Sequence, residues 1–410
     1  MEYLANSSAE SLNGCERGGL DAAQAPRDFA LCPRRVRRFK SQDAADGQEF
    51  ESLSLHCGAQ LWYSDGMAHP LTAQPRTDPT QVYRYRDGLY AEDMLITALV
   101  WLDLFSWLGE HPSKLEHICR QFGIQARPAD VMLTLLVAMG LLERREEVFS
   151  INEVAREHLT RGSPWFLGPY YASLKERPVC KDLLHVLRTG KPANWGSEKG
   201  RQDWHKSMET EEFAEQFTAA MDCRGTFLAQ AAAKKLDLGS CRSLLDIAGG
   251  SGIYACSFVA HFPALRATVL EKPPVDGITR KAVAKRGFTS QVDVIASDML
   301  GAPLPDGFDA HLYSNVLHDW DEPVVRRLLE KSRDALASGG LLIIHDAHLN
   351  EDKSGPLHVA EYSVMLMHST EGRCYSVAEM RRYLTDAGFT DVKFIPTAAA
   401  RSLVTARRCG

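Results

Sequence analysis

A histidine and two acids stand where an apolar, strand-like segment ends. Residues 309–315 (DAHLYSN) run directly into residues 316–321 (VLHDWD). Ligands of open α/β sheets bind at the carboxyl ends of the strands. A histidine has an unperturbed pKa of about 6.5, so it can accept a proton near neutral pH. His318 is therefore a candidate general base. Asp319 could orient its ring, or could instead cap the helix that follows.

A glycine-rich loop follows a second apolar segment, in residues 244–252 (LLDIAGGSG). Gly249, Gly250 and Gly252 allow a tight turn and a close approach of the backbone to a ligand, with Ser251 between them. Residues 250–255 also fit the G-x-G-x-x-A pattern of dinucleotide sites. The loop alone is therefore compatible with a nucleotide-like ligand, with a dinucleotide, or with a purely structural turn.

Acidic residues at three successive strand ends narrow this choice. Asp246 lies inside the first strand end, where a carboxylate could hold an ammonium group directly or through water. Glu271 ends the next strand, where it could accept hydrogen bonds from both hydroxyls of a ribose. Asp298 ends the third strand, where it could accept from an adenine amino group while Met299 packs on the ring. Three such acids favour a bound nucleoside over a solvated surface.

The elements that position these residues belong to an α/β fold. From residue 243 onward, short apolar strands alternate with amphipathic helices, which predicts βαβ units and a parallel sheet. The tail at 392–408 reads as two strands without a helix between them, which predicts a closing antiparallel hairpin. We assign residues 236–410 to a Rossmann-like domain.

Residues 76–235 are predicted to form a helical domain. Three helices and a β-turn-β wing within 91–159 follow the winged-helix pattern, which raises DNA binding as a hypothesis. Residues 91–161 carry eleven acids and seven bases, and the helix at 127–142 offers Arg127 and almost no other polar side chain. Such an apolar helix is expected to be buried in a core or against a partner subunit.

Composition bounds the remaining possibilities. The chain has 410 residues, a net charge of −6, and ten scattered cysteines without a CxxC pair. This pattern predicts a cytoplasmic protein with free thiols and no metal site, nucleic-acid partner, membrane span or secretory signal. Residues 1–75 are expected to be a flexible or irregular extension. The basic cluster at 32–40 could alternatively make it a docking arm for an anionic partner.

Taken together, the motifs resemble those of a known family. LLDIAGGSG, LEKP, SDM, SNVLHDWDE and SGGLLIIHDAHL are similar to the motifs of class I, AdoMet-dependent small-molecule O-methyltransferases. This family includes caffeate and acetylserotonin O-methyltransferases and bacterial tailoring enzymes. The resemblance runs from about residue 91 to residue 408. It implies a winged-helix-like domain for dimerisation and substrate covering, a small-molecule acceptor, a homodimer, and S-adenosyl-L-methionine (AdoMet) as cofactor, with S-adenosyl-L-homocysteine as product.

The resemblance also implies roles for individual residues. His318 matches the catalytic base. The cofactor-binding positions are Asp246, Gly249, Gly250, Ser251 and Gly252 for the methionine part, Glu271 for the ribose, Asp298 and Met299 for the adenine, and Asn315 as a further polar contact. Met365, His368 and Cys374 are assigned to the substrate pocket. Hydroxyls of aromatic or polyketide-like molecules are the acceptors that this resemblance suggests.

One departure from the family pattern bears on the mechanism. Cys374 takes the place of a glutamate that flanks the base in many members, so another residue must supply that carboxylate if one is needed. Asp346, Glu361 and Glu371 are the candidates. Cys374 itself could be a neutral part of the pocket wall or a thiolate that acts as a base.

Two other functions stay open at this point. Relatives with this fold methylate nitrogen, sulfur or carbon, or use the cofactor for other reactions, and Cys374 gives this alternative some weight. A winged-helix regulator that binds a ligand without turnover is the second alternative. The excess of acids in residues 91–161 is unfavourable for binding DNA, and an intact His318 also argues against a regulator without turnover.

Overall fold

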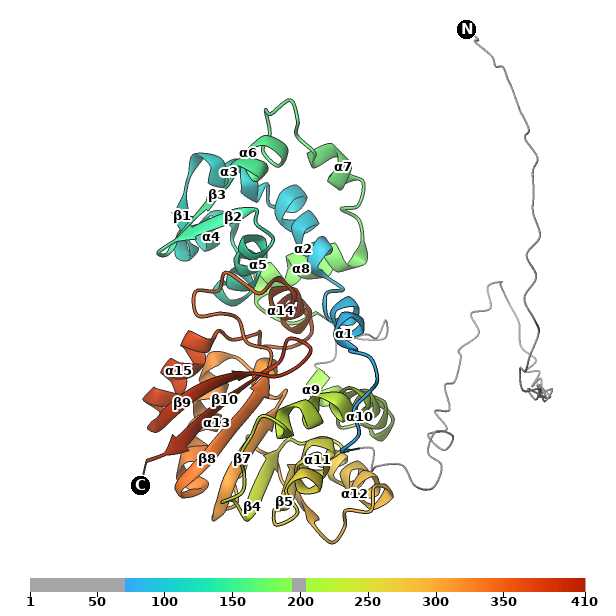
Figure 1. The fold of residues 1–410 in the computed structure, drawn as a ribbon. Helices are drawn as coiled ribbons and strands as arrows, with labels where there is room; N and C mark the ends of the chain where they lie inside the picture. Colours follow the sequence, from blue (N-terminus) through green and yellow to red (C-terminus); the bar gives the residue numbers. More distant parts are fainter. Residues whose placement is uncertain (1–70, 194–203, 410) are drawn as a thin grey trace, which may run out of the picture. The chain divides into compact units, whose positions relative to one another are not determined.

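The computed structural model describes residues 71–193 and 204–409 (Figure 1). Residues 1–70, with the basic cluster at 32–40, lie outside the described residues, so the structure does not test most of the expected N-terminal extension. Among the residues that are described, no helix is long and apolar enough to span a membrane.

The first half of the described chain is mainly helical. Its helices are α1 (Thr80–Asp87), α2 (Ala91–Ile96), which continues as the π-helical turn η1 (Thr97–Trp101), α3 (Leu104–Glu110), α4 (Leu115–Phe122), α5 (Ala126–Ala138), α6 (Glu153–His158), α7 (Gly168–Ala172), α8 (Pro178–Thr189), α9 (Trp204–Ser207) and α10 (Glu211–Ala233). The strands β1 (Ser113–Lys114), β2 (Leu142–Arg145) and β3 (Val148–Ile151) form an antiparallel sheet in the order β1-β3-β2. The predicted β-turn-β unit is confirmed as β2 and β3.

Helix α5 is shorter than the predicted helix at 127–142, because it ends before Gly140. This glycine has a φ of 68°, a left-handed conformation that commonly terminates helices. The predicted burial of the helix is confirmed, since Met132, Leu133 and Leu136 are completely buried. Arg127 donates hydrogen bonds to the carbonyl oxygens of Gly190 and Gly372, each at 2.8 Å. This side chain therefore serves the fold and does not project as a DNA-reading group would.

A seven-stranded sheet forms the second half, in the order β6-β5-β4-β7-β8-β10-β9 (Figure 1). The strands β4 (Ser243–Ile247), β5 (Arg266–Glu271), β6 (Val292–Ala296), β7 (Phe308–Ser314) and β8 (Leu336–Asp346) are parallel, whereas β9 (Phe389–Pro396) and β10 (Ser402–Arg408) form the antiparallel end. The predicted strands and the closing hairpin are therefore confirmed. The remaining helices are α11 (Ile253–His261), α12 (Val275–Lys285), α13 (Glu322–Ala335), α14 (Leu357–Ser369) and α15 (Val377–Asp386), with a 3₁₀ turn η2 at Leu317–Asp319.

The sheet is buried on both faces, because consecutive apolar residues of a strand point to opposite faces. In β4, Leu244 packs in a core with α10 and α11, and its neighbour Leu245 packs in a second core with α13 and α15. Burial of each leucine side chain stabilises the fold by about 1.5–3 kcal/mol. The carboxyl ends of the parallel strands consequently meet at one edge, and the loops that leave them are held in place by two packed layers.

Helix α14 belongs by its position in the chain to the predicted domain at 236–410, but it packs with the helical half. It follows β8 in the chain, but its residues Val359, Ala360 and Val364 belong to the core of the helical half. Helix α5 is its main partner in that core. The helical half therefore reaches the carboxyl edge of the sheet through a helix that the C-terminal half contributes.

Candidate active site

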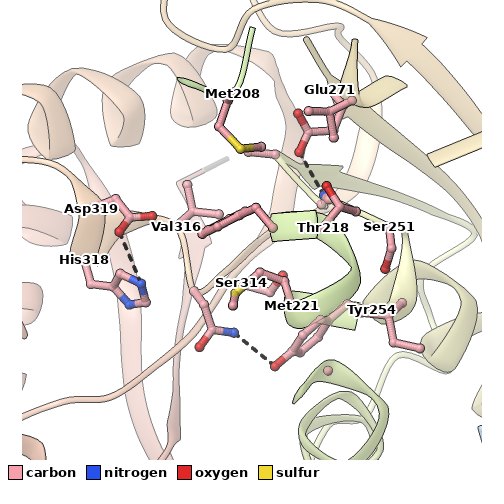
Figure 2. A pocket seen from close by; sticks show the side chains of 18 of the residues that line it. Met208, Thr218, Met221, Ser251, Tyr254, Glu271, Ser314, Val316, His318 and Asp319 are labelled. Atoms are coloured by element: carbon pink, nitrogen blue, oxygen red, sulfur yellow. Dashed lines mark hydrogen bonds and ion pairs between the residues drawn. The ribbon is translucent and has the colours of Figure 1, made fainter. Parts of the chain in front are cut away.

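A pocket opens at the carboxyl edge of the parallel strands, between the sheet and helices α10 and α14. Figure 2 shows His318 and Asp319 at one end of it and Glu271 at the other. The predicted site residues that line this pocket are Gly249, Gly250, Ser251, Glu271, Asp298, Met299, Asn315, His318 and Met365. The chain thus brings the glycine loop, the acids of two strand ends and the candidate base to one cavity.

Asp246 lies directly beneath the glycine loop. Its side chain is completely buried, and the backbone N–H of Ala255 approaches the carboxylate without forming a hydrogen bond of normal geometry. A Cβ atom on Gly249 would come within 2.5 Å of Asp246 Oδ2, so this glycine is needed for the loop to cover the carboxyl. Burial raises the pKa of Asp246 to about 7. A buried carboxylate without a partner is costly, and a ligand ammonium group would satisfy it.

Glu271 ties the end of β5 to the same loop. Its Oε1 accepts a hydrogen bond from the backbone N–H of Gly250 at 2.8 Å, and its Oε2 accepts from the N–H of Lys272 at 3.1 Å. Burial raises the pKa of Glu271 to about 7 in spite of these bonds. Asp298 lies two residues beyond the end of β6, and its neighbour Met299 is only 9% exposed. Both lie in the pocket lining, as a nucleoside site requires.

Asn315 carries a second unsatisfied acceptor. Its backbone is left-handed, with a φ of 55°, and its N–H donates to the carbonyl oxygen of His345 at 2.9 Å. The side-chain Nδ2 donates a hydrogen bond to the hydroxyl of Tyr254 at 3.2 Å. The buried Oδ1 has no hydrogen-bond partner within the described chain. Asn315 lines the pocket, so this oxygen could accept a hydrogen bond from a ligand there.

His318 sits in the 3₁₀ turn after β7 and is 3% exposed. Its Nδ1 lies 2.5 Å from Oδ1 of Asp346. Burial opposes the charged form of Asp346, but contact with His318 lowers the pKa of this carboxyl to about 2, so it can only accept. Nδ1 therefore carries the ring proton in the neutral histidine, and Nε2 retains the lone pair that a general base needs.

The charges around His318 favour its protonated form. Burial opposes the imidazolium, but the carboxylates of Asp346 and Asp319 outweigh burial and raise the pKa of His318. Nε2 lies 3.6 Å from Asp319 Oδ1, the contact drawn in Figure 2. Asp319 is not the helix cap, because Asp321 accepts the N–H of Val324 at the start of α13. Of the three carboxylates that the sequence offered in place of the missing glutamate, Asp346 is the one that contacts His318.

Asp246 and three other predicted site residues do not line the pocket. Gly252 lies under the loop against Val283. His368 packs in the helical half, where its ring lies tilted against the ring of Tyr90, with 4.7 Å between the ring centroids. Cys374 is completely buried, and burial raises the pKa of its thiol well above the ordinary value. The structure therefore supports the neutral thiol among the two roles considered for Cys374.

Several lining residues were not identified from the sequence. Helix α10 contributes Phe217, Met221 and Arg224, which follow one another at positions i, i+4 and i+7 and so share one helix face. The first turn of α11 contributes Tyr254 to the pocket lining. The i, i+4, i+7 spacing is visible in the sequence, but it could equally have described a face buried in a core.

Comparison with known proteins identifies the family. A family model for the O-methyltransferase domain matches residues 180–390, about half of the chain, and this match includes the glycine loop, the strand-end acids and His318. The chain belongs to the O-methyltransferase family. The predicted family, the Rossmann-like fold with a helical N-terminal domain, and the activity of an AdoMet-dependent O-methyltransferase are thereby confirmed, and AdoMet is the methyl donor.

Individual relatives cover most of this O-methyltransferase. The 3-hydroxy-5-methyl-1-naphthoate 3-O-methyltransferase of Streptomyces sahachiroi is 32% identical over 323 residues, which are 78% of this chain and 92% of the relative. The tetracenomycin polyketide synthesis 8-O-methyl transferase TcmO of Streptomyces glaucescens is 32% identical over 337 residues, 80% of this chain and 97% of the relative. A crystal structure of an O-methyltransferase family 2 protein from Planctomyces limnophilus, in complex with apigenin, matches with a TM-score of 0.75 and 32% identity, covering 82% of this chain and 98% of that one.

Replacing Cys374 with serine is expected to change the rate of methyl transfer by less than about threefold, because a neutral thiol outside the pocket takes no part in proton transfer. The measurement is single-turnover methyl transfer with an acceptor, and a thermal melt shows how much stability the buried hydroxyl costs. A loss as large as that of a His318 variant would instead identify Cys374 as a working thiolate.

Proposed function

We propose that this O-methyltransferase transfers the methyl group of AdoMet to a hydroxyl of a small aromatic or polyketide-like molecule, with His318 as the general base. The observation that carries the proposal is the His318–Asp346 contact, which leaves Nε2 as the basic nitrogen of a residue in the same pocket as the glycine loop. The names of the two Streptomyces relatives, a naphthoate and a tetracenomycin polyketide enzyme, support this class of acceptor.

The chain's own contribution to the reaction is positioning and proton removal. AdoMet supplies a methyl group that its positively charged sulfur has already activated. The pocket must hold the acceptor oxygen in line with that methyl group and exclude water. Nε2 of His318 takes the hydroxyl proton, and Asp346 stabilises the resulting imidazolium through Nδ1. Asp246, Asn315 and the glycine loop would hold the methionine part, and Glu271, Asp298 and Met299 the nucleoside.

Mass spectrometry with a panel of phenols, naphthols and flavonoids tests the proposal. The protein is incubated with each acceptor and with AdoMet carrying a deuterated methyl group, and a product heavier by that methyl group is expected. Fragmentation or NMR then locates the new bond. A methyl group on a ring carbon would contradict the choice of oxygen and restore the alternative that rested on Cys374, which does not line the pocket.

The affinity for S-adenosyl-L-homocysteine is expected to fall as the pH drops below about 7. Asp246 and Glu271 both have a pKa of about 7 in the free protein because they are buried. The ligand's ammonium and ribose hydroxyls bind the charged carboxylates, so binding lowers both pKa values. Each carboxyl that must lose a proton then costs up to ~10-fold in affinity per pH unit below its free pKa.

Calorimetry between about pH 6 and pH 8, in two buffers of different ionisation heat, measures both the affinity and the protons released. The Asp246→Asn variant should bind more weakly and show a shallower pH dependence, because one titrating carboxyl has been removed. A dissociation constant that does not vary over this range would contradict the assigned roles of both acids.

We further propose that residues 76–235 form a winged-helix-like domain that dimerises and covers the substrate, and that residues 236–410 form the cofactor domain. Apolar side chains around α7 support a homodimer, since Trp165 is 63% exposed and Tyr170 is 74% exposed, with Leu167 and Leu174 beside them.

Light scattering at micromolar concentration is expected to give the mass of two chains. A Trp165→Glu, Tyr170→Glu variant should be monomeric, and a monomeric parent protein would contradict the proposal.

A further inference from the structure

Arg224 brings a positive charge to the acceptor side of the pocket. It lies on α10 and lines the cavity. Its Nη1 donates a hydrogen bond to the hydroxyl of Tyr362 at 3.1 Å. The ring of Tyr362 meets the ring of His318 edge to face, with 5.6 Å between their centroids. The guanidinium is therefore fixed next to the wall that carries the candidate base.

Arg224 is half-buried and has no anionic partner among the described residues, whereas several other arginines that are withdrawn from solvent do have one. Arg401 pairs with Asp87 at 2.8 Å, and Arg373 pairs with Glu379 at 2.7 Å. Arg286 pairs with Asp222. Arg224 forms no ion pair with any residue that the structure describes, and its side chain makes no hydrogen bond there other than the one to Tyr362. Its remaining N–H groups are available to a ligand in the pocket.

A guanidinium that lines a pocket without an anionic partner can bind an opposite charge of a ligand, and such a pair is strongest when it is held in good geometry. A guanidinium presents two parallel N–H groups that match the two oxygens of a carboxylate. The walls around this point are suited to an aromatic ring, since Trp320, Tyr362, Met365 and Leu366 all line the cavity. An acceptor that combines a ring, a hydroxyl and a carboxylate would use each of these features.

We propose, building on the proposed function, that the acceptor is an aromatic hydroxy acid whose carboxylate binds Arg224 while its hydroxyl reaches Nε2 of His318. AdoMet also contains a carboxylate, which shares this chemistry. The contact of Arg224 with Tyr362, which packs against His318, assigns the site to the acceptor. Arg224 is then a specificity-determining residue that selects acids over neutral molecules of the same shape.

Binding of unreactive probes tests this assignment without knowledge of the true acceptor. Calorimetry compares 1-naphthoate and 2-naphthoate with the corresponding naphthamides, which keep the shape but lack the charge, on the protein saturated with S-adenosyl-L-homocysteine. One of the acids is expected to bind ~10–100-fold more tightly than its amide, as hydrogen bonds between charged groups allow. Arg224→Gln should abolish this preference, and Arg224→Lys should retain part of it. The control is Arg84→Gln, an exposed arginine on α1 outside the pocket lining, which should leave the preference unchanged.

Three results would overturn the proposal. The parent protein could show no preference for the acids, or Arg224→Gln could keep the preference. Alternatively, Arg224→Gln could lower the affinity for S-adenosyl-L-homocysteine at least ~10-fold but leave the affinity for 5′-methylthioadenosine, which lacks the amino-acid part, unchanged. Arg224 would then bind the carboxylate of the cofactor. The proposed function fails separately. If no phenol, naphthol or hydroxy acid is methylated but the naphthoates bind as expected, the carboxylate site stands and the proposed reaction falls.

Discussion

Replacing His318 with alanine is expected to slow methyl transfer by ~10²–10⁴-fold while the affinity for S-adenosyl-L-homocysteine stays unchanged. The base takes the acceptor's proton as the new bond forms, so its removal raises the barrier of the chemical step. His318 has no part in the set of acids and glycines that would hold the cofactor. Single-turnover methyl transfer gives the rate, and calorimetry with the product cofactor gives the affinity.

The pH dependence separates a base from a residue that only shapes the pocket. Asp346 and Asp319 raise the pKa of His318, so the neutral, basic form is lost as the pH falls through that raised pKa. The parent protein should therefore show a rate that rises with pH along a limb above the ordinary histidine pKa of about 6.5. Asp346→Asn removes the main raising charge, and the limb should move to lower pH while the maximal rate falls.

A fully active His318→Ala variant would remove the assignment of the base. A loss of less than about tenfold would show that positioning of the acceptor and the activated sulfonium do most of the work. A limb that does not move in Asp346→Asn would show that some other group titrates. These results leave the family membership untouched, because it depends on the chain as a whole.

Replacing Gly372 with alanine is expected to slow methyl transfer by ~10²-fold, the effect of a displacement of about 1 Å at a reacting group. A Cβ atom on Gly372 would overlap the carbonyl oxygen of His318 and the backbone of Asp319. The loop cannot retreat easily, because Arg127 of α5 holds the carbonyl of Gly372 at 2.8 Å and Arg127 is itself bound to Gly190. The 3₁₀ turn that carries the base must shift instead.

Gly277→Ala is the matched control. Gly277 lies in α12, outside the pocket lining, and a Cβ atom there would meet no atom within 4 Å apart from its chain neighbours and the backbone of its own helix. This variant should keep the full rate and gain a little stability from the better helix propensity of alanine. Gly372→Ala should bind S-adenosyl-L-homocysteine as the parent protein does. Full activity of Gly372→Ala would show that the loop yields and that the contact does not position His318.

The sequence was sufficient to predict those helices and strands whose pattern lies within a short stretch of neighbouring residues. The strands of the second half are short apolar segments and its helices follow an apolar period of about 3.6 residues, and each such pattern is read within a few neighbouring residues. Gly249 to Ser251, Glu271 and Asp298 could be predicted to lie around one cavity, because loops and strand ends of a parallel sheet converge on one edge whatever the details of packing. The position of His318 at the same edge could be predicted in the same way, because it lies in the turn after β7.

Only the tertiary structure decided which groups act on one another. Asp346 is 28 residues from His318, and the parallel register of β7 and β8, which pairs Ser314 with His345, is what brings the two side chains together. Cys374 was placed in the pocket wall by its position in the chain, but the packing of its loop buries it away from the cavity. The packing of α14 in the helical core and the lack of an anionic partner for Arg224 have the same origin. Such contacts depend on strand register and on helix packing between segments far apart in the chain. A local sequence pattern carries no information about them.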